Sequence, residues 1–232
     1  MPTFSIVIPV YNEARYIPVG LPRLLAELDA AGLDYRVLIM ENGSTDGSAA
    51  VAEAVAGDAP VEVHTLPVAD YGAAMYEGFR RADGDWVVNF DIDYFSASFL
   101  QSVLKLEDEA DLVIASKRDP ESEDRRPWLR RLATAVFNFL LRSLFGSSVT
   151  DTHGMKAFRH ELVDDLVGKV VSREDLFDTE LVLRAERKGY RIVEVPVIVE
   201  ETRPARSILK RVPRTLRGLW RIRRILGASS FF

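Results

Sequence analysis

The chain contains 232 residues, of which 47% are hydrophobic and 28% are charged, a composition that excludes a disordered protein. It contains no cysteine, which excludes disulfides, zinc ribbons and thiol catalysis. The net charge of −5 at pH 7 argues against a nucleic-acid partner, because an acidic body repels phosphates.

The first 116 residues alternate short apolar runs with helical stretches. Strands are predicted at 4–10, 35–41, 61–66, 85–91 and 111–116, and helices at about 14–31, 45–56, 71–82 and 97–108. This alternation of Val- and Ile-rich strands with helices predicts an α/β fold, with a mostly parallel central sheet flanked by helices on both faces. Ligands bind such sheets beyond the carboxyl ends of the strands, so residues 9–13, 41–46 and 91–93 are expected along one rim.

The pattern changes after residue 116. The segment KRDPESEDRRP at 117–127 is polar, charged and bounded by proline, which predicts a mobile loop. A helix at 128–145, a turn at 151–158, a helix at about 175–188 and a strand at 191–199 are expected to follow. The N-terminus has no basic lead and no apolar run approaches transmembrane length, so we expect a soluble protein of the cytoplasm.

In DGDWVVNFDIDYFSAS, residues 83–98, an apolar strand leads into Asp91 and Asp93. Side chains at positions i and i+2 of an extended segment point to the same side, so these carboxylates are expected to converge. Carboxylate oxygens suit hard cations such as Mg²⁺ and Mn²⁺, which keep further positions for water and substrate phosphates. The position at a strand end favours a metal–diphosphate site, and a solvated turn is the alternative.

Two other strand ends carry turn and capping residues. In ENGSTDGS at 41–48, Gly43 permits a tight turn and Ser44, Thr45 or Asp46 suits a helix cap, so a plain strand–helix turn is the simpler interpretation. PVYNE at 9–13 is open to the same interpretation. No G-x-G-x-x-G follows the first strand and no G-x-x-x-x-G-K-[ST] occurs, which argues against dinucleotide binding and excludes a P-loop.

Taken in order, these segments resemble the family-2 glycosyltransferases of the GT-A fold, and most of all the polyprenyl-phosphate sugar transferases, the dolichol-phosphate mannosyl- and glucosyltransferase kind. The resembling segments span about residues 4–210: SIVIPVYNE, ENGSTDGS, DYGAAMYEGFRRADGD, NFDIDYF, VIASKR, DTHGMKAF, FDTELVLRAERKGYRIVEVPV and ETRPARSI. The resemblance implies a Rossmann-like nucleotide-sugar-binding half at 1–95, an acceptor-binding half of the same domain at 96–202, and a basic tail at 203–232.

The resemblance also implies roles for individual residues. Nucleotide contacts fall on Pro9, Tyr11, Glu13, Glu41, Asn42 and Gly72. Asp91 would bridge ribose and metal, while Asp93 would ligate Mg²⁺ or Mn²⁺ on the donor diphosphate. The acceptor phosphate would be bound by Lys117, Arg118, Arg130 or Arg131, Arg203 and Arg206.

The sequence departs from the family pattern in three segments. Phe95 stands where related lipid-phosphate enzymes often place Gln, so the resemblance provides no third protein ligand for the metal. Glu41 and Asn42 replace a pair of Asp residues, which leaves the base preference open. Residues 68–70 replace the usual Asn-x-Gly before YGAA.

Asp178 matches the position of the general base in many family-2 enzymes, which a hydroxyl acceptor would need. A phosphomonoester acceptor has a second pKa of about 6 and is already an anion at neutral pH, so arginines would matter more than a base. The alternative for Asp178 is a carboxylate at a helix start, stabilised by the helix dipole. His153 is interpreted as a turn or acceptor-loop residue, because no second His or Cys accompanies it.

The tail at 203–232 carries nine Lys and Arg residues, and no Asp or Glu follows Glu201. Pro213 suits the first turn of a helix that runs to about Leu226. Basic residues fall in one arc of the helical wheel, namely Lys210, Arg214, Arg217, Arg221 and Arg224. The apolar residues lie mostly opposite this arc, namely Leu216, Leu219, Trp220 and Leu226. Such a helix predicts contact with a membrane surface, and the alternative packs its apolar face on the protein's own core.

These inferences combine into one functional prediction. The protein is expected to be an inverting, metal-dependent hexosyltransferase that moves a sugar from a GDP- or UDP-sugar to a polyprenyl phosphate, peripheral to the cytoplasmic face of the membrane. One alternative is a glycosyltransferase for a small soluble acceptor, such as a sugar phosphate or glycerate phosphate. The other is a catalytically silent sugar-nucleotide-binding protein at the membrane.

Overall fold

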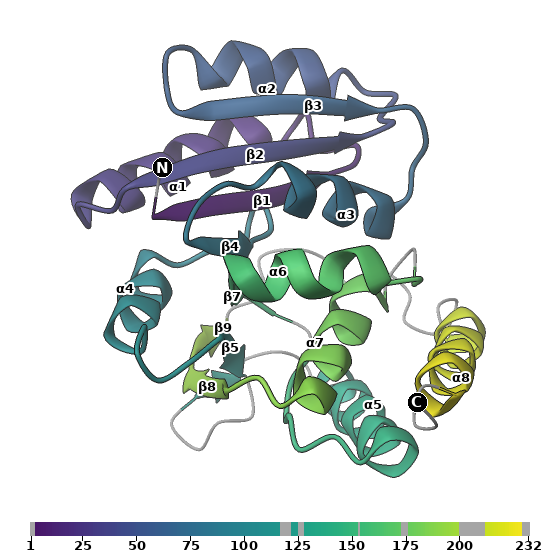
Figure 1. Ribbon diagram of the computed structural model, residues 1–232. Coiled ribbons are helices and arrows are strands. Elements are labelled where there is room, and N and C mark those ends of the chain that lie inside the picture. The colour runs from purple at the N-terminus through teal and green to yellow at the C-terminus, as the bar shows by residue number, and fades with distance from the viewer. Residues whose placement is uncertain are drawn as a thin grey trace.

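The computed structural model describes residues 3–116, 122–124, 128–152, 154–172, 176–199 and 212–228 (Figure 1). Its first half alternates strands with helices: β1 (Phe4–Val10), α1 (Ile17–Ala30), β2 (Tyr35–Asn42), α2 (Ser48–Ala56), β3 (Val61–Leu66), α3 (Tyr71–Arg81), β4 (Trp86–Asn89), α4 (Ala97–Lys105) and β5 (Leu112–Ser116). Every strand and helix predicted for this half is present, with ends that differ by a few residues. The predicted α/β class is therefore confirmed.

The second half contains β6 (Glu123–Asp124), α5 (Trp128–Phe145), β7 (Lys156–Arg159), α6 (His160–Leu166), the 3₁₀ helix η1 (Val167–Lys169), α7 (Phe177–Lys188), β8 (Ile192–Pro196), β9 (Ile198–Val199) and α8 (Val212–Ala228). The strand predicted at 191–199 is divided into β8 and β9. Pro196 has no N–H to donate to a neighbouring strand, and the N–H of Val197 donates instead to Ser122 Oγ at 2.8 Å. The chain then pairs with β6 rather than with β5.

The described strands form a seven-stranded sheet in the order β3-β2-β1-β4-β7-β5-β8, and β6 pairs with β9 separately. The pairs β3–β2, β2–β1, β1–β4 and β5–β8 are parallel, which agrees with the predicted mostly parallel sheet. β7 lies between β4 and β5 and is antiparallel to both. The prediction of a turn at 151–158 is therefore wrong for residues 156–158, because pairing with two distant strands decides their conformation. Helix α6, which follows directly, was not predicted either.

Helices cover both faces of the sheet, as the sequence predicts. Buried side chains of α1, α2 and α4 pack on one face, and those of α3, α6 and α7 pack on the other. On the second face, the ring of Phe79 meets the rings of Phe158 and Phe177 edge-on, at centroid distances of 5.4 and 5.5 Å. Full burial of each such side chain stabilises the fold by about 1.5–3 kcal/mol.

Helix α8 packs with α5 and α7 at the end of the molecule that is remote from α2 and β3 (Figure 1). The guanidinium of Arg187 on α7 donates to the carbonyl oxygen of Leu226 at 2.6 Å, close to the end of α8. The buried residues of this three-helix cluster are Leu141, Leu176, Leu183, Leu219, Ile222 and Leu226.

This packing corrects part of the prediction for the basic tail. Leu219 and Leu226 belong to the protein core, whereas Leu216 and Trp220 are exposed. The apolar side of α8 is thus shared between the protein's own core and the surface. Among the described helices, none combines the length and the apolar content that crossing a bilayer requires.

Candidate active site

The chain leaves β1 and β2 at the same end of the sheet, and the two exit loops are hydrogen-bonded to each other. The N–H of Asn12 donates to Ser44 Oγ at 2.9 Å, and the N–H of Thr45 donates to Asn12 Oδ1 at 2.9 Å. The N–H of Glu13 donates to Ser48 Oγ at 2.8 Å. Asn12 has a φ of 55°, in the left-handed region that Asn tolerates better than most residues. The two loops therefore form one fixed floor at the rim of the sheet.

Glu41 and Asn42 lie at the end of β2 and are buried. The Glu41 carboxylate accepts a hydrogen bond from the N–H of Ser44, and Asn42 Oδ1 accepts one from the N–H of Asp70 at 2.8 Å. Asp70 in turn caps α3 by accepting from the N–H of Ala73 at 3.0 Å. Both residues thus hold the rim loops in place, and their predicted contact with a nucleoside stays a prediction.

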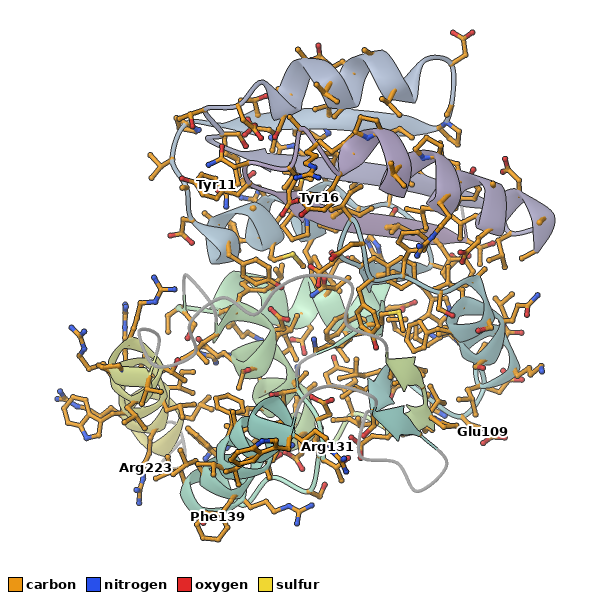
Figure 2. All side chains as sticks on the ribbon, turned by 180° about the vertical axis from the view of Figure 1, so that it is seen from behind. Tyr11, Tyr16, Glu109, Arg131, Phe139 and Arg223 are labelled. Atoms are coloured by element: carbon orange, nitrogen blue, oxygen red, sulfur yellow. The ribbon has the colours of Figure 1, made fainter. Side chains whose placement is uncertain are left out.

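The other residues predicted to contact a nucleotide lie on the same elements. Tyr11 follows β1 and is exposed at the surface (Figure 2). Pro9 and Glu13 are half-buried, and Gly72 is buried in the first turn of α3. The end of β1 and the start of α3 therefore border the floor that the β1 and β2 exit loops form.

Asp91 and Asp93 lie in a tight turn that follows β4. The backbones of Asp91 and Tyr94 exchange two hydrogen bonds of 3.1 Å each, so Ile92 and Asp93 form the tip. The prediction of an extended segment is wrong here, because this pair of bonds closes the chain on itself. Asp91 is exposed and Asp93 is half-buried, so neither residue is enclosed in the core.

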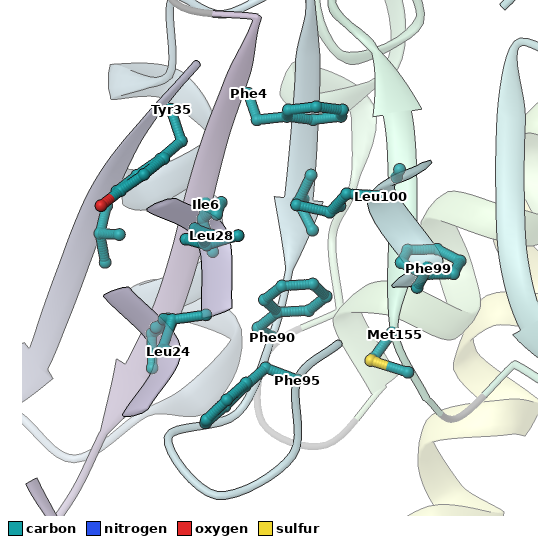
Figure 3. Packing of buried hydrophobic residues seen from close by; sticks show 14 of the residues in the cluster. Phe4, Ile6, Leu24, Leu28, Tyr35, Phe90, Phe95, Phe99, Leu100 and Met155 are labelled. Carbon is teal, nitrogen blue, oxygen red and sulfur yellow. The ribbon is translucent and has the colours of Figure 1, made fainter. Parts of the chain in front are cut away.

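Two apolar side chains anchor this turn in the core. Ile92 and Phe95 are buried in the cluster beneath α1, where Figure 3 shows Phe95 next to Phe90. The Arg23 guanidinium lies over the Phe95 ring, 4.4 Å from its centroid. A Cβ on Gly20 of α1 would overlap the carbonyl oxygen of Ile92. The carboxylates therefore stand on a turn whose backbone is packed against α1.

A buried polar cluster adjoins the turn. Asp178 Oδ2 accepts hydrogen bonds from Lys156 Nζ at 3.1 Å, from Asn89 Nδ2 at 3.2 Å and from the Tyr71 hydroxyl at 3.2 Å. Burial, followed by the negative charges of Asp178 and Asp91, raises the pKa of Tyr71 well above its usual value of 10. The phenol is therefore a permanent donor, and Asp91 lies close enough to act on it electrostatically.

Comparison with known proteins identifies the family. Residues 5–167 match the family described as "Glycosyl transferase family 2". The chain belongs to glycosyl transferase family 2. It is 33% identical over 195 residues to the uncharacterized glycosyltransferase Rv0539 of Mycobacterium tuberculosis, with 83% of each chain covered. It is 31% identical over 205 residues to the glycosyltransferase AglD of Haloferax volcanii, which covers 83% of this chain and 32% of that protein.

Solved structures confirm the GT-A fold for this family-2 glycosyltransferase. Glucosyl-3-phosphoglycerate synthase from Mycobacterium tuberculosis, in complex with Mn²⁺, UDP and phosphoglyceric acid, superposes with a TM-score of 0.70 at 20% identity, covering 95% of this chain and 77% of that one. Mannosyl-3-phosphoglycerate synthase from Rubrobacter xylanophilus gives a TM-score of 0.69 at 22% identity, covering 97% and 75%. At these identities the likeness concerns the fold.

Most of the basic residues predicted to bind an acceptor phosphate lie outside the described residues, as does His153. Arg131 is exposed near the start of α5 (Figure 2), and the backbone of Arg130 belongs to the same helix. The predicted residues outside the described ranges are Lys117, Arg118, Arg203 and Arg206. Phosphate binding by all six stays a prediction.

Three residues of the polar cluster in this family-2 glycosyltransferase were not predicted from the sequence as site residues: Lys156, Tyr71 and Asn89. The only local signal is a single lysine within the otherwise apolar or small run GMKAF at 154–158. Asp178 was singled out, with a role as base or as a helix-start carboxylate left open. The structure places it in the first turn of α7 and also in an ion pair with Lys156.

Proposed function

We propose that this family-2 glycosyltransferase transfers a sugar from a nucleoside-diphosphate sugar to an acceptor that carries a phosphate monoester, with inversion at the anomeric carbon. Asp91 and Asp93 would hold a divalent cation, Mg²⁺ or Mn²⁺, against the donor diphosphate. The observation that carries the proposal is the anchored turn after β4, which presents two carboxylates at the ligand-binding end of the sheet.

The chemistry of this turn fits a hard cation. Carboxylate oxygens are preferred ligands of Mg²⁺ and Mn²⁺, which usually retain positions for water and substrate phosphates. Within the described ranges, no group of three or more His, Asp or Glu side chains could hold a metal, so Asp91 and Asp93 would act as a pair. When bound, the ion would supply Lewis-acid stabilisation to the departing diphosphate. The Mn²⁺ and UDP bound by glucosyl-3-phosphoglycerate synthase support this assignment by analogy.

The floor formed by the β1 and β2 exit loops is the place proposed for the nucleoside. Tyr11 offers an exposed ring there, and Glu13 is half-buried beside it. Glu41 and Asn42 would act by keeping the floor rigid, because their side chains bind the backbone of the surrounding loops. A preorganised floor binds a nucleoside with less loss of conformational entropy.

The acceptor proposed first is a small phosphorylated molecule. The two solved structures described above are named as synthases of glucosyl- and mannosyl-3-phosphoglycerate, the first with phosphoglyceric acid bound, and they share the fold over most of this chain. A phosphate monoester that attacks through one of its own oxygens is already an anion at neutral pH and needs no general base, whereas attack through a hydroxyl, which 3-phosphoglycerate also carries, releases a proton. The hydrogen bonds that Asp178 already accepts agree with attack through a phosphate oxygen. The basic residues proposed to bind its phosphate are Lys117, Arg118, Arg130, Arg131, Arg203 and Arg206.

A polyprenyl phosphate is the second candidate acceptor, and the surface of α5 and α8 favours it. On α5, Trp128 and Phe139 are 69% and 68% exposed and fall on one side of the helix with Leu132 and Val136. On α8, Trp220 is 61% exposed and is surrounded by arginines. Neither helix contains Asp or Glu. We define the α5–α8 surface as Trp128, Leu132, Val136, Phe139, Leu216, Arg217, Trp220, Arg221, Arg223 and Arg224.

This combination of side chains suits an anionic lipid surface. Exposed aromatic and aliphatic residues insert at the headgroup level, and each nearby arginine adds about 1 kcal/mol of attraction to an anionic leaflet. A second copy of the chain is a poorer occupant, because two surfaces with only positive charges repel each other.

A transfer assay with paired acceptors tests the proposed function. The full chain is incubated with Mn²⁺ and labelled UDP-glucose or GDP-mannose. Each acceptor is offered with and without its phosphate: 3-phosphoglycerate against glycerate, and polyprenyl phosphate against polyprenol in anionic vesicles. We expect transfer only to a phosphorylated acceptor, and the productive pair identifies the soluble or the lipid source. Equal transfer to the dephosphorylated partner contradicts the proposal, and donor binding without any transfer supports the catalytically silent alternative.

A further inference from the structure

Lys156 is a fully buried lysine in the middle of the central sheet. Its strand, β7, is paired on both sides, with β4 and with β5, and its side chain is 0% exposed. A buried ammonium is costly unless it is paired and hydrogen-bonded. Lys156 Nζ donates to Asp178 Oδ2 at 3.1 Å and to the carbonyl oxygen of Gly154 at 2.8 Å. Asp178 is thus its ion-pair partner.

The Asp178 carboxylate is engaged through both of its oxygens. Oδ2 accepts from Lys156, from Asn89 and from Tyr71, and Oδ1 lies 3.1 Å from the same Tyr71 hydroxyl. Donors within the protein therefore occupy both oxygens of Asp178, which suits a residue that holds the structure rather than one that contacts an acceptor.

The same cluster reaches the Asp91–Asp93 turn through β4. Asn89 is the last residue of β4 and lies opposite Lys156 in the register of β4 and β7. Its Nδ2 donates to Asp178 and also to the Tyr71 hydroxyl at 3.3 Å. Two residues later the chain enters the turn at Asp91. The cluster thus ties α3, α7 and β7 to the strand end that carries the carboxylates.

We infer that Lys156 and Asp178 are positioning residues: their buried ion pair holds the end of β4, and with it the Asp91–Asp93 turn, in the geometry that binds a metal–diphosphate. Asp178 accepts hydrogen bonds throughout the reaction and takes no proton from the acceptor. An acceptor that attacks through an oxygen of a phosphate monoester, which is already an anion at neutral pH, needs no such proton acceptor. The inference rests on the proposed function for the ligand that the turn binds. The statement that the ion pair holds β4 in place depends only on the observed contacts.

The first arm of the test is a double-mutant cycle on stability, which needs no ligand. Lys156→Met and Asp178→Asn each leave one buried partner uncompensated, so each is expected to lower the Tm by about 10 °C. The double variant removes both charges and is expected to recover more than half of that loss. Additive losses in the double variant would overturn the ion-pair assignment, whether or not the protein binds a nucleotide.

The second arm measures Mn²⁺ affinity by calorimetry in the presence of saturating UDP or GDP, whichever the wild-type protein binds more tightly. Each single variant is expected to weaken Mn²⁺ binding about 10- to 100-fold, as loss of supporting contacts around a metal site does, and the double variant to return within about threefold of wild type. Arg184→Met is the matched control, because it breaks the other buried ion pair of α7, with Glu180. It should lower the Tm and leave Mn²⁺ affinity unchanged.

The opposite pattern identifies a general base. Asp178→Asn would then keep wild-type stability and Mn²⁺ affinity, while kcat for transfer would fall about 10²- to 10⁴-fold, and the double variant would be no more active. That result overturns the inference and leaves the proposed function standing. A wild-type protein that binds neither nucleotide with Mn²⁺ would instead defeat the proposed function, and the stability cycle would still decide the ion pair.

Discussion

The backbone of α1 at Gly20 lies directly against the carbonyl oxygen of Ile92, the residue between the two carboxylates of the rim turn. A methyl group at this position overlaps that oxygen, so Gly20→Ala must displace the turn or the helix. We expect a loss of stability of about 1–3 kcal/mol, typical of overpacking, and weaker Mn²⁺-dependent nucleotide binding, although no carboxylate is altered. Thermal unfolding and calorimetry measure the two effects.

Gly168→Ala is the matched control for this substitution. A Cβ at Gly168 meets nothing within 4 Å, and the residue lies in η1, on the face of the sheet opposite α1. We expect Gly168→Ala to leave nucleotide binding at the wild-type level. Equal binding by Gly20→Ala and wild type would show that the turn does not depend on its support from α1.

Asn12 combines a left-handed backbone with a side chain that receives the N–H of the neighbouring loop. Asn12→Gly loses the hydrogen bond but has no Cβ in the left-handed region, whereas Asn12→Ala loses the same bond and keeps a Cβ there, a strain of about 1–2 kcal/mol relative to glycine. Denaturant unfolding should therefore rank wild type above the glycine variant and the glycine variant above the alanine variant. An alanine variant as stable as the glycine variant would contradict the role assigned to the backbone.

The contacts of the Asp165 carboxylate predict how the free energy of unfolding depends on pH. Its carboxylate accepts from Lys188, from Lys169 and from the Tyr190 hydroxyl, and these bonds, that of Lys188 foremost, hold the pKa of Asp165 below its usual range. Burial, and then Asp165, raises the pKa of Tyr190 to about 12. A lowered carboxyl pKa contributes stability above the unfolded value of about 3.9, and that contribution is lost as the pH falls towards the folded value.

Asp165→Asn should accordingly be less stable than wild type by a constant amount between pH 7 and about pH 5, and the difference should shrink below about pH 4. Urea unfolding over this pH range measures it. The effect is modest, because both lysines are half-exposed and screened by solvent. A difference that persists or grows in acid would show that Asp165 acts through packing rather than through its charge.

The α5–α8 surface predicts a separable effect on membrane binding. Trp220→Ser combined with Phe139→Ser removes two exposed aromatic residues and should leave the fold intact. Loss of about 2 kcal/mol of interfacial contact corresponds to roughly 30-fold weaker binding to anionic vesicles. Co-sedimentation measures it, and Val19→Ser with Val68→Ser serves as the control, since both valines are exposed in the other half of the chain. Equal vesicle binding by all three proteins would remove the support for a lipid acceptor.

Most of the sheet follows from local sequence patterns. β1, β2, β4 and β5 are buried apolar runs, and each is bounded by turn residues that punctuate the chain. β7 escapes the same reasoning because it has only four residues, begins with Lys156 and ends with Arg159, and its conformation depends on pairing with β4 and β5. Long-range pairing leaves no mark in a window of a few residues.

The residues of the candidate site likewise include some that the sequence reveals and others that it does not. Asp91 and Asp93 are visible in the sequence because they follow an apolar run one residue apart, although their turn geometry is not. The cluster around Asp178 is invisible, because Tyr71, Asn89, Lys156 and Asp178 come from four separate elements and meet only in the folded chain. The sequence also left undecided how much of α8 is buried in the protein core, since an amphipathic helix has the same pattern on a protein core as on a membrane.

Calorimetric titration of UDP and GDP, with and without Mn²⁺, tests the central claim most directly when wild type is compared with Asp93→Asn and with the exposed control Asp58→Asn. We predict that Mn²⁺ strengthens the binding of at least one nucleotide to wild type and to Asp58→Asn. For Asp93→Asn, we predict that the strengthening by Mn²⁺ is reduced by more than about 100-fold, while the Tm stays within a few degrees of the wild-type value. Mn²⁺-dependent binding of equal strength in folded Asp93→Asn would contradict the account.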